Sequence, residues 1–204
     1  SEAEFNSVTF TSSAGTAQTF TMATRGLRIG GTLSITDTVS TTALGTSVSN
    51  LAITAPTVTI GAGGILTANG SIITVTSFSS TAGTYTVGTS TIVVSASGGT
   101  ISIDETANSV TVNSAINTTL GNSLTFTGTL TLTSATAAFG ASSLTCSGTA
   151  TITFASATIT MSTGSWSTSA CTSFTATSSS VTLSGTGNVM LAAGQSFATL
   201  EVNG

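Results

Sequence analysis

Short apolar pairs separated by one residue, usually Thr or Ser, recur along the whole chain. Because side chains alternate between the two faces of a strand, each triplet turns two apolar side chains to one face and the middle one to the other. A helical period is hard to find. The triplets therefore predict short strands at Val8 and Phe10, Phe20 and Met22, Leu27 and Ile29, Leu33 and Ile35, Leu51 and Ile53, Val58 and Ile60, Ile73 and Val75, Tyr85 and Val87, Ile92 and Val94, Ile101 and Ile103, Val110 and Val112, Leu124 and Phe126, Leu130 and Leu132, Leu144 and Cys146, Ala150 and Ile152, Ile159 and Met161, Val181 and Leu183, and Leu200 and Val202.

Gly, Ser and Asn separate these strands, and parts of the chain repeat. The segment 123–133 matches the segment 143–153, which aligns Phe126 with Cys146. The hexapeptide that starts at Gly30 returns at Gly98, with a related Gly-Gly-Ile-Leu from Gly63 about midway. Short strands with small-residue corners and internal repeats are typical of a solenoid. We predict coils of about 20 residues, or about 34 where a corner is expanded.

The fold prediction is all-β, a parallel β-solenoid that occupies residues 1–204 as one continuous domain, since only Pro56 interrupts the chain and nothing reads as a linker. An antiparallel β-sandwich remains an alternative. A related alternative is a jelly-roll, pilin-like subunit that donates residues 1–11 as a strand to its neighbour. In the solenoid, Leu124, Phe126, Leu130, Leu132, Leu144, Cys146, Ala150 and Ile152 are predicted to be buried, with the intervening Thr residues largely exposed.

Ionisable side chains are almost absent. The chain has two Lys or Arg residues, six Asp or Glu residues and no His, with a net charge of −4. Acid/base and nucleophilic catalysis need such groups, so we expect no enzymatic activity and no cofactor. Phosphate contacts need clustered basic residues, which argues against nucleic acid as a partner. No apolar run reaches the length of a membrane helix, so no membrane insertion is expected.

Several segments resemble the Thr/Ser-rich β-helical repeats of large prokaryotic cell-surface and adhesin-like proteins. They are residues 5–10, the Gly-Gly-Thr-Leu-Ser-Ile at Gly30, the Thr-Leu-Thr-Leu runs and residues 194–202. The resemblance covers nearly the whole chain and implies an exported, extracellular protein with a structural or adhesive role. It carries over no functional residues.

The acidic residues Asp37, Asp104 and Glu105 are the weak candidates for a metal site, because each follows a Gly-Gly-Thr-Leu/Ile-Ser-Ile element. A shared calcium site is conceivable, but calcium takes six to eight oxygen ligands and no calcium-binding loop motif is present. We therefore expect solvated corner residues and no metal. Arg25 and Arg28 could pair with Glu2, Glu4 or a neighbouring subunit, but exposed pairs contribute little, so both are interpreted as ordinary surface charges.

The two cysteines, Cys146 and Cys171, allow one disulfide. Adjacent coils lie about 4.8 Å apart, which suits a bridge, but we expect two buried free thiols. Asn69 and Asn117 begin the sequons Asn-Gly-Ser and Asn-Thr-Thr, and both are candidates for N-glycosylation in an exported chain.

The two ends of the chain share the pattern Phe-x-x-apolar-x-apolar, at Phe5, Val8 and Phe10 and again at Phe197, Leu200 and Val202. No capping element is recognisable at either end, so we expect these residues to contact another copy or module head to tail. The sequence thus predicts either one module of a longer tandem repeat protein or a homopolymer, and in both cases a surface filament or fibre that attaches to a cell surface or an abiotic surface. The alternative function is ice or surface binding through Thr-x-Thr arrays.

Overall fold

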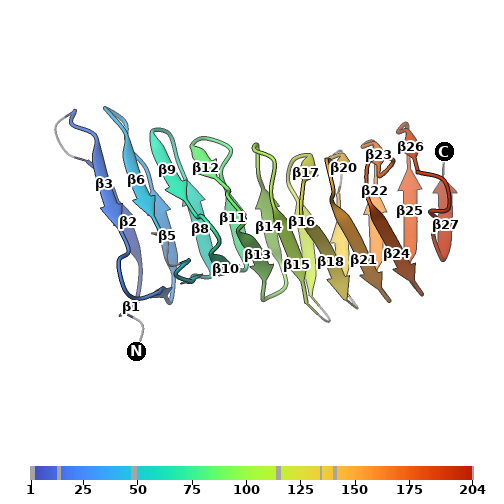
Figure 1. Ribbon diagram of the computed structural model, residues 1–204, viewed down its shortest axis with the longest axis horizontal. Coiled ribbons are helices and arrows are strands. Elements are labelled where there is room, and N and C mark those ends of the chain that lie inside the picture. The colour runs from blue at the N-terminus through green and yellow to red at the C-terminus, as the bar shows by residue number, and fades with distance from the viewer. Residues whose placement is uncertain are drawn as a thin grey trace.

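The computed structural model describes residues 3–12, 15–46, 50–113, 116–133, 135–139 and 142–203. These residues form an all-β, Thr-rich parallel β-solenoid of about nine turns and contain no helix, which confirms the fold prediction. The coils follow one another along the long axis from the N-terminal to the C-terminal end (Figure 1). Each coil contributes one strand to each of three faces, apart from the exceptions given below.

The first face is a nine-stranded sheet. Its strands, in spatial order, are β1 (Ala3–Phe5), β4 (Leu27–Ile29), β7 (Ile53–Thr54), β10 (Ile72–Val75), β13 (Thr91–Val94), β15 (Ser109–Val112), β18 (Thr129–Thr133), β21 (Thr151–Ala155) and β24 (Ser173–Thr177).

The second face is a ten-stranded sheet, which extends one strand further than the first. Its strands are β2 (Val8–Phe10), β5 (Thr32–Ile35), β8 (Thr57–Ile60), β11 (Ser77–Ser79), β14 (Gly99–Ser102), β16 (Asn117–Leu120), β19 (Thr136–Ala138), β22 (Thr158–Met161), β25 (Ser180–Ser184) and β27 (Thr199–Asn203).

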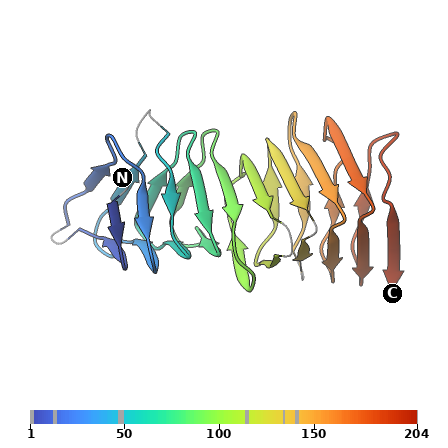
Figure 2. The same ribbon diagram turned by 90° about the horizontal axis from the view of Figure 1, so that it is seen from below.

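The third face consists of two four-stranded sheets. The first holds β3 (Gln18–Thr21), β6 (Thr42–Gly45), β9 (Gly64–Thr67) and β12 (Thr84–Thr86), and the second holds β17 (Leu124–Phe126), β20 (Leu144–Cys146), β23 (Trp166–Ser167) and β26 (Val189–Met190). Between them a single bridge pairs Ala107 with Phe126. A second view, turned by 90°, shows the same succession of coils (Figure 2).

Every strand pair in the described part of the chain is parallel, for example β2 with β5 and β1 with β4. The antiparallel sandwich and the jelly-roll alternatives are therefore wrong. The segment that a pilin-like subunit would donate instead forms β1 and β2, which pair with strands of their own chain; residues 1 and 2 lie outside the described residues.

Coil length varies along the stack. The shortest paired coil runs from Thr91 to its partner Ser109, and the longest runs from Leu27 to its partner Ile53. The prediction that expanded corners lengthen some coils to about 34 residues is wrong, because no paired strands in the described chain lie that far apart in sequence.

The glycine-rich elements occupy other places than their spacing predicted. The two Gly-Gly-Thr elements lie three coils apart rather than two, because Leu33 pairs with Val58, Val58 with Phe78, and Phe78 with Ile101. The Gly-Gly-Ile-Leu segment belongs to β9 on a different face.

The repeat that relates segment 123–133 to segment 143–153 is correct in its first half and shifted in its second. Leu124 pairs with Leu144 and Phe126 with Cys146, as the repeat predicts. Leu130, however, pairs with Ile152 instead of Ala150. A shift by two positions keeps every side chain on its predicted face, since strands alternate with a period of two. For this reason all eight residues predicted to be buried are buried.

The intervening threonines are half-buried and not largely exposed as predicted; this holds for Thr125, Thr129 and Thr131. Neighbouring coils cover the sides of each outward residue, because strands in a sheet lie only about 4.8 Å apart. The hydroxyls of Thr129 and Thr151, for example, lie 3.0 Å apart. Between the faces runs one continuous apolar core, in which Trp166 and Tyr85 are among the largest buried side chains.

The second glycine of the Gly-Gly-Thr element occupies a crowded corner between the first and second faces. A Cβ at Gly99 would lie 1.8 Å from the carbonyl oxygen of Thr76 in the preceding coil, and one at Gly31 would lie 2.7 Å from that of Asn6. Only glycine permits this approach of two backbones, which explains why the element recurs at this corner.

Candidate functional surfaces

Asp37 is a structural residue at the corner that follows β5. Its carboxylate accepts hydrogen bonds from the Ser12 hydroxyl, from the backbone N–H groups of Val39 (2.9 Å) and Ser40 (3.1 Å), and from the hydroxyls of Ser40 (3.0 Å) and Thr42 (3.1 Å). These donors, the Ser12 hydroxyl foremost, hold the pKa of Asp37 well below its usual range. With its oxygens occupied by N–H and O–H donors, Asp37 ties two coils together.

Glu105 plays a similar part after β14. It accepts hydrogen bonds from the Tyr85 backbone N–H and the Ser80 hydroxyl, both at 2.6 Å. It is thus not a freely solvated corner residue. Asp104 is exposed and accepts a bond from the Asn122 amide.

The structure does not assemble the shared calcium site considered above. Asp37 lies three coils from Asp104 and Glu105, which amounts to about 14 Å at the spacing of parallel strands. No cluster of three or more His, Cys, Asp or Glu side chains occurs within the described residues.

The only tyrosine, Tyr85, is buried in the core. Its hydroxyl lies 2.6 Å from that of Ser90, which is also buried. Burial foremost raises the pKa of Tyr85 to about 12; the Ser90 hydrogen bond opposes this shift, and the nearby Glu105 carboxylate adds to it.

Cys146 and Cys171 form a disulfide, with their Cα atoms 5.4 Å apart and both residues buried. The expectation of two free thiols is therefore wrong. Cys146 lies in β20, and Cys171 follows a turn after β23, so the bridge fastens the turn of one coil to the strand of the coil before it. The sequence placed both residues near the core but did not show that their coils are adjacent.

The sequons differ in accessibility. Asn117 begins β16, and both Asn117 and Thr119 are exposed on the second face. Asn69 is half-buried in a left-handed conformation (φ 51°), and Ser71 of the same sequon is fully buried. The geometry therefore favours Asn117 over Asn69 as an acceptor.

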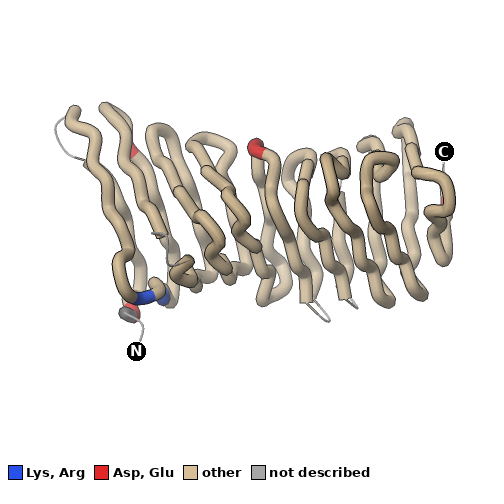
Figure 3. Tube along the Cα trace, in the orientation of Figure 1, with Lys and Arg blue, Asp and Glu red and all other residues tan. Residues whose placement is uncertain are grey.

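Both arginines lie near the N-terminal end of the stack (Figure 3). Arg28 forms an exposed ion pair with Glu4, with Nε and Oε1 3.8 Å apart. Glu2 lies outside the described residues. An exposed pair of this kind contributes about 0 to 1 kcal/mol, so these charges have little weight in the stability of the fold.

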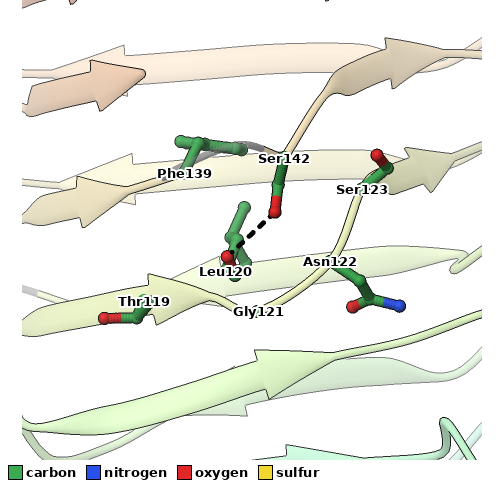
Figure 4. A pocket seen from close by; sticks show the side chains of 7 residues that line it. All are labelled: Thr119, Leu120, Gly121, Asn122, Ser123, Phe139 and Ser142. Atoms are coloured by element: carbon green, nitrogen blue, oxygen red, sulfur yellow. Dashed lines mark hydrogen bonds between the residues drawn. The ribbon is translucent and has the colours of Figure 1, made fainter. Parts of the chain in front are cut away.

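An open depression of about 470 Å³ lies over β16 and the following turn. Its lining is Thr119, Leu120, Gly121, Asn122, Ser123, Phe139 and Ser142, and the Ser142 hydroxyl is occupied by a hydrogen bond of 3.2 Å to the Leu120 carbonyl (Figure 4). None of these side chains carries a charge. The depression offers no acid, base or nucleophile with an adjacent base, so it does not have the composition of a catalytic site.

The N-terminal end exposes residues that point into the core in later coils. Phe5 pairs with Ile29 and Phe20 with Leu44, both of which are buried. Phe5 and Phe20 themselves remain 49% and 38% exposed, because they lie in the first coil that the structure describes. Val8 and Phe10 of β2 are half-buried, and their outer strand edge is unpaired.

The C-terminal end is partly capped, contrary to the prediction that neither end has a cap. Residues 191–198 cross this end between β26 and β27, and Phe197 packs on Trp166 and Phe174 with ring centroids 5.2 and 5.5 Å apart. The Gln195 side chain accepts a hydrogen bond from the Thr168 hydroxyl and donates one to the backbone carbonyl of Thr168. Phe197 is thus half-buried and packs against the core of its own chain.

β27 is left as an open edge beyond this cap. Leu200 pairs with Val181 and Val202 with Leu183, which gives both side chains an inward direction. They are nevertheless 44% and 65% exposed, because they lie in the last strand that the structure describes.

Threonines form two regular columns on the outside of the first face. One column joins Thr111, Thr131, Thr153 and Thr175 through successive paired strands, and a second joins Thr129, Thr151 and Ser173. From β18 through β21 to β24 the paired residues are 22 positions apart in both steps, so the array is regular there, whereas Thr111 and Thr131 are 20 positions apart.

No helix in the described ranges is long and apolar enough to cross a membrane. Comparison with protein-family models, with curated proteins and with solved structures gave no match. The chain is a Thr-rich parallel β-solenoid of about nine turns whose distinctive surfaces are its two ends and its hydroxyl-covered faces.

Proposed function

We propose that this protein is an extracellular structural or adhesive element that stacks head to tail into a surface filament. The observation that carries the proposal is that the second face has an unpaired strand edge at both ends, and that each end of the stack exposes side chains of the core register, Phe5 and Phe20 at one end and Leu200 and Val202 at the other. Open edges of this kind template further strands. Because the two ends differ, their contact is heterologous, and repeated along the long axis of the stack it does not close into a ring but generates an open filament.

The surface chemistry supports a structural role. Few groups titrate, and the backbone hydrogen bonds run from coil to coil throughout the described stack, so the rod is expected to withstand changes of pH and salt. The Cys146–Cys171 disulfide supports export, since such bonds persist in oxidising compartments. The proposed partners of the protein are copies of itself and a cell surface or an abiotic surface. The proposal includes no enzymatic activity, cofactor, nucleic acid or membrane insertion.

Electron microscopy and sedimentation velocity of the purified chain at increasing concentration test this function. We expect filaments, and we expect Val202→Asp to abolish them while the monomer keeps its β-sheet circular dichroism, because Val202 is largely exposed within one chain. Asn203→Asp, the adjacent outward residue of β27, is the matched control and is expected to polymerise. A wild-type chain that stays monomeric at all concentrations would refute the proposal.

A second candidate function is binding of ice or another periodic surface through the threonine columns of the first face. The favouring observation is their regularity: hydroxyls repeat at about 4.8 Å between coils and at about 6.8 Å along a strand. Thermal hysteresis measures this activity. Thr153→Arg is expected to abolish it and Thr160→Arg, an exposed site on the second face, to preserve it; a wild-type chain without thermal hysteresis removes the ice-binding function.

A further inference from the structure

The second face offers the same kind of edge at both ends of the molecule. β2 has a partner, β5, on one side only, and β27 has a partner, β25, on one side only. All strands in this sheet are parallel, so the free edge of β27 faces in the direction from which the next coil would be added. A second copy with the same orientation presents β2 to that edge.

The apolar residues of the two edge strands match in number and spacing. Leu200 and Val202 point inward from β27, and Val8 and Phe10 point inward from β2, with one outward residue between the members of each pair. Pairing these strands covers the exposed parts of all four side chains, as each coil inside the molecule covers the next.

We propose that β27 of one copy pairs in parallel with β2 of the following copy, with Leu200 opposite Val8 and Val202 opposite Phe10. The inference rests on the proposed head-to-tail assembly and specifies its partner strands and their register. The outward residues Glu201 and Thr9 then stand opposite each other. No acidic residue occurs in β2 or β5, so Glu201 meets no like charge there.

The pairing inside the sheet suggests a second register, which competes with the proposed one. Successive paired residues form a column across the second face. The column that contains Glu201 runs toward the N-terminal end through Thr182, Thr160, Ala138, Thr119 and Thr100, and Thr100 directly precedes Ile101 in the chain. Ile101 lies in the same column as Val8, so the column of Glu201 is the one that contains Ser7. If the columns simply continued into the next copy, Glu201 would therefore stand opposite Ser7.

The apolar pair of the second face is displaced by one inward position within the molecule. In β5 the two inward apolar residues are Leu33 and Ile35, and in β25 they are Val181 and Leu183. Leu183, the second residue of its pair, lies in the same column of paired residues as Leu33, the first residue of its pair. A straight continuation would therefore leave Leu200 opposite the polar, exposed Asn6. The proposed register instead places apolar side chains opposite each other at both inward positions, and burial of two pairs outweighs burial of one.

Paired cysteines distinguish the two registers. Thr9, Ser7 and Glu201 are all exposed, so their replacement leaves the core intact. In the proposed register, Thr9→Cys and Glu201→Cys bring two Cα atoms to about 4.8 Å, which suits a disulfide, whereas Ser7→Cys lies about 8 Å from Glu201→Cys. The native pair Cys146 and Cys171 already bridges two coils at 5.4 Å.

The experiment compares the two double variants, Thr9→Cys with Glu201→Cys and Ser7→Cys with Glu201→Cys, after mild oxidation. We expect a ladder of covalent oligomers on non-reducing gels for the first and none for the second. Intramolecular bonds are impossible, because the two sites lie at opposite ends of a stack of about nine turns. Mixing the single variants Thr9→Cys and Glu201→Cys is expected to give a covalent heterodimer but no ladder.

Each other outcome overturns a defined part of the inference. A ladder only from the Ser7→Cys pair refutes the register but keeps the β27–β2 junction. Filaments in electron micrographs without any cross-linking refute the junction and leave the proposed function standing. A chain that is monomeric in sedimentation and forms no cross-links refutes both.

Discussion

Leu132 in the middle of β18 allows a direct test of the core. It is 1% exposed and pairs with Val112 in the preceding coil and Phe154 in the following coil. Replacing a buried Leu by Ala typically costs about 2 to 5 kcal/mol of unfolding free energy. Leu132→Asp adds an unpaired carboxylate in an apolar site, which costs several kcal/mol more.

The combined cost of Leu132→Asp is comparable with the whole stability of a typical domain, about 5 to 15 kcal/mol. In a solenoid each coil contacts only its neighbours, so the damage also interrupts the stack on both sides. We expect Leu132→Asp to abolish folding or assembly and Leu132→Ala to lower the denaturation midpoint by an intermediate amount.

Guanidinium titration followed by circular dichroism measures these effects. Thr153→Asp is the matched control, because Thr153 is exposed on the next strand of the same sheet, and we expect its unfolding free energy to stay within about 0.5 kcal/mol of the wild type. A Leu132→Asp protein with wild-type β-sheet signal, midpoint and particles would refute the assignment of this position to the core.

Three further predictions concern the polar and sulfur groups. Replacing both Cys146 and Cys171 by Ser removes a cross-link across a short loop and is expected to cost about 3 kcal/mol in denaturant titration; an unchanged midpoint would contradict this. Because the pKa of Asp37 is lower in the folded than in the unfolded state, the ionised carboxylate stabilises the fold above the unfolded pKa of about 3.9, and this stabilisation is lost as the pH falls below that value. The variant Asp37→Asn is therefore expected to lose less stability in acid than the wild type, which thermal melts at pH 2 to 6 would measure. Because the folded pKa of Tyr85 is raised, the unfolded state releases its proton first, and stability is expected to fall between about pH 10 and pH 12; phenolate absorbance of this single tyrosine should appear only near pH 12, and ionisation at pH 10 would show that it is not buried.

The sequence by itself determined which side chains face the core. Leu124, Phe126 and Leu132 were placed correctly because alternation between faces depends only on the strand backbone. It did not reveal β6, β9, β16 or β19, whose inward positions include Thr42, Gly64, Thr118 and Ala137 in place of two large apolar residues. Inside a stack, neighbouring coils bury even these small or hydroxyl-bearing side chains.

The candidate sites were less accessible to sequence reasoning, because they depend on which coils are adjacent. The likeness of Phe5 and Phe197 did not show that one lies exposed in β1 and the other packs on Trp166. Similar corner positions of Asp37 and Glu105 did not show that three coils separate them.

Only the tertiary structure decided the lateral register of the strands, the closeness of Cys146 and Cys171, and the extension of β27 past the cap. A period of two fixes the face of a residue but is unchanged by a slip of two positions, as the pairing of Leu130 with Ile152 illustrates. Register, cross-links and free edges depend instead on the length of each corner and on the packing of one coil against the next, which alternation along a single strand does not encode.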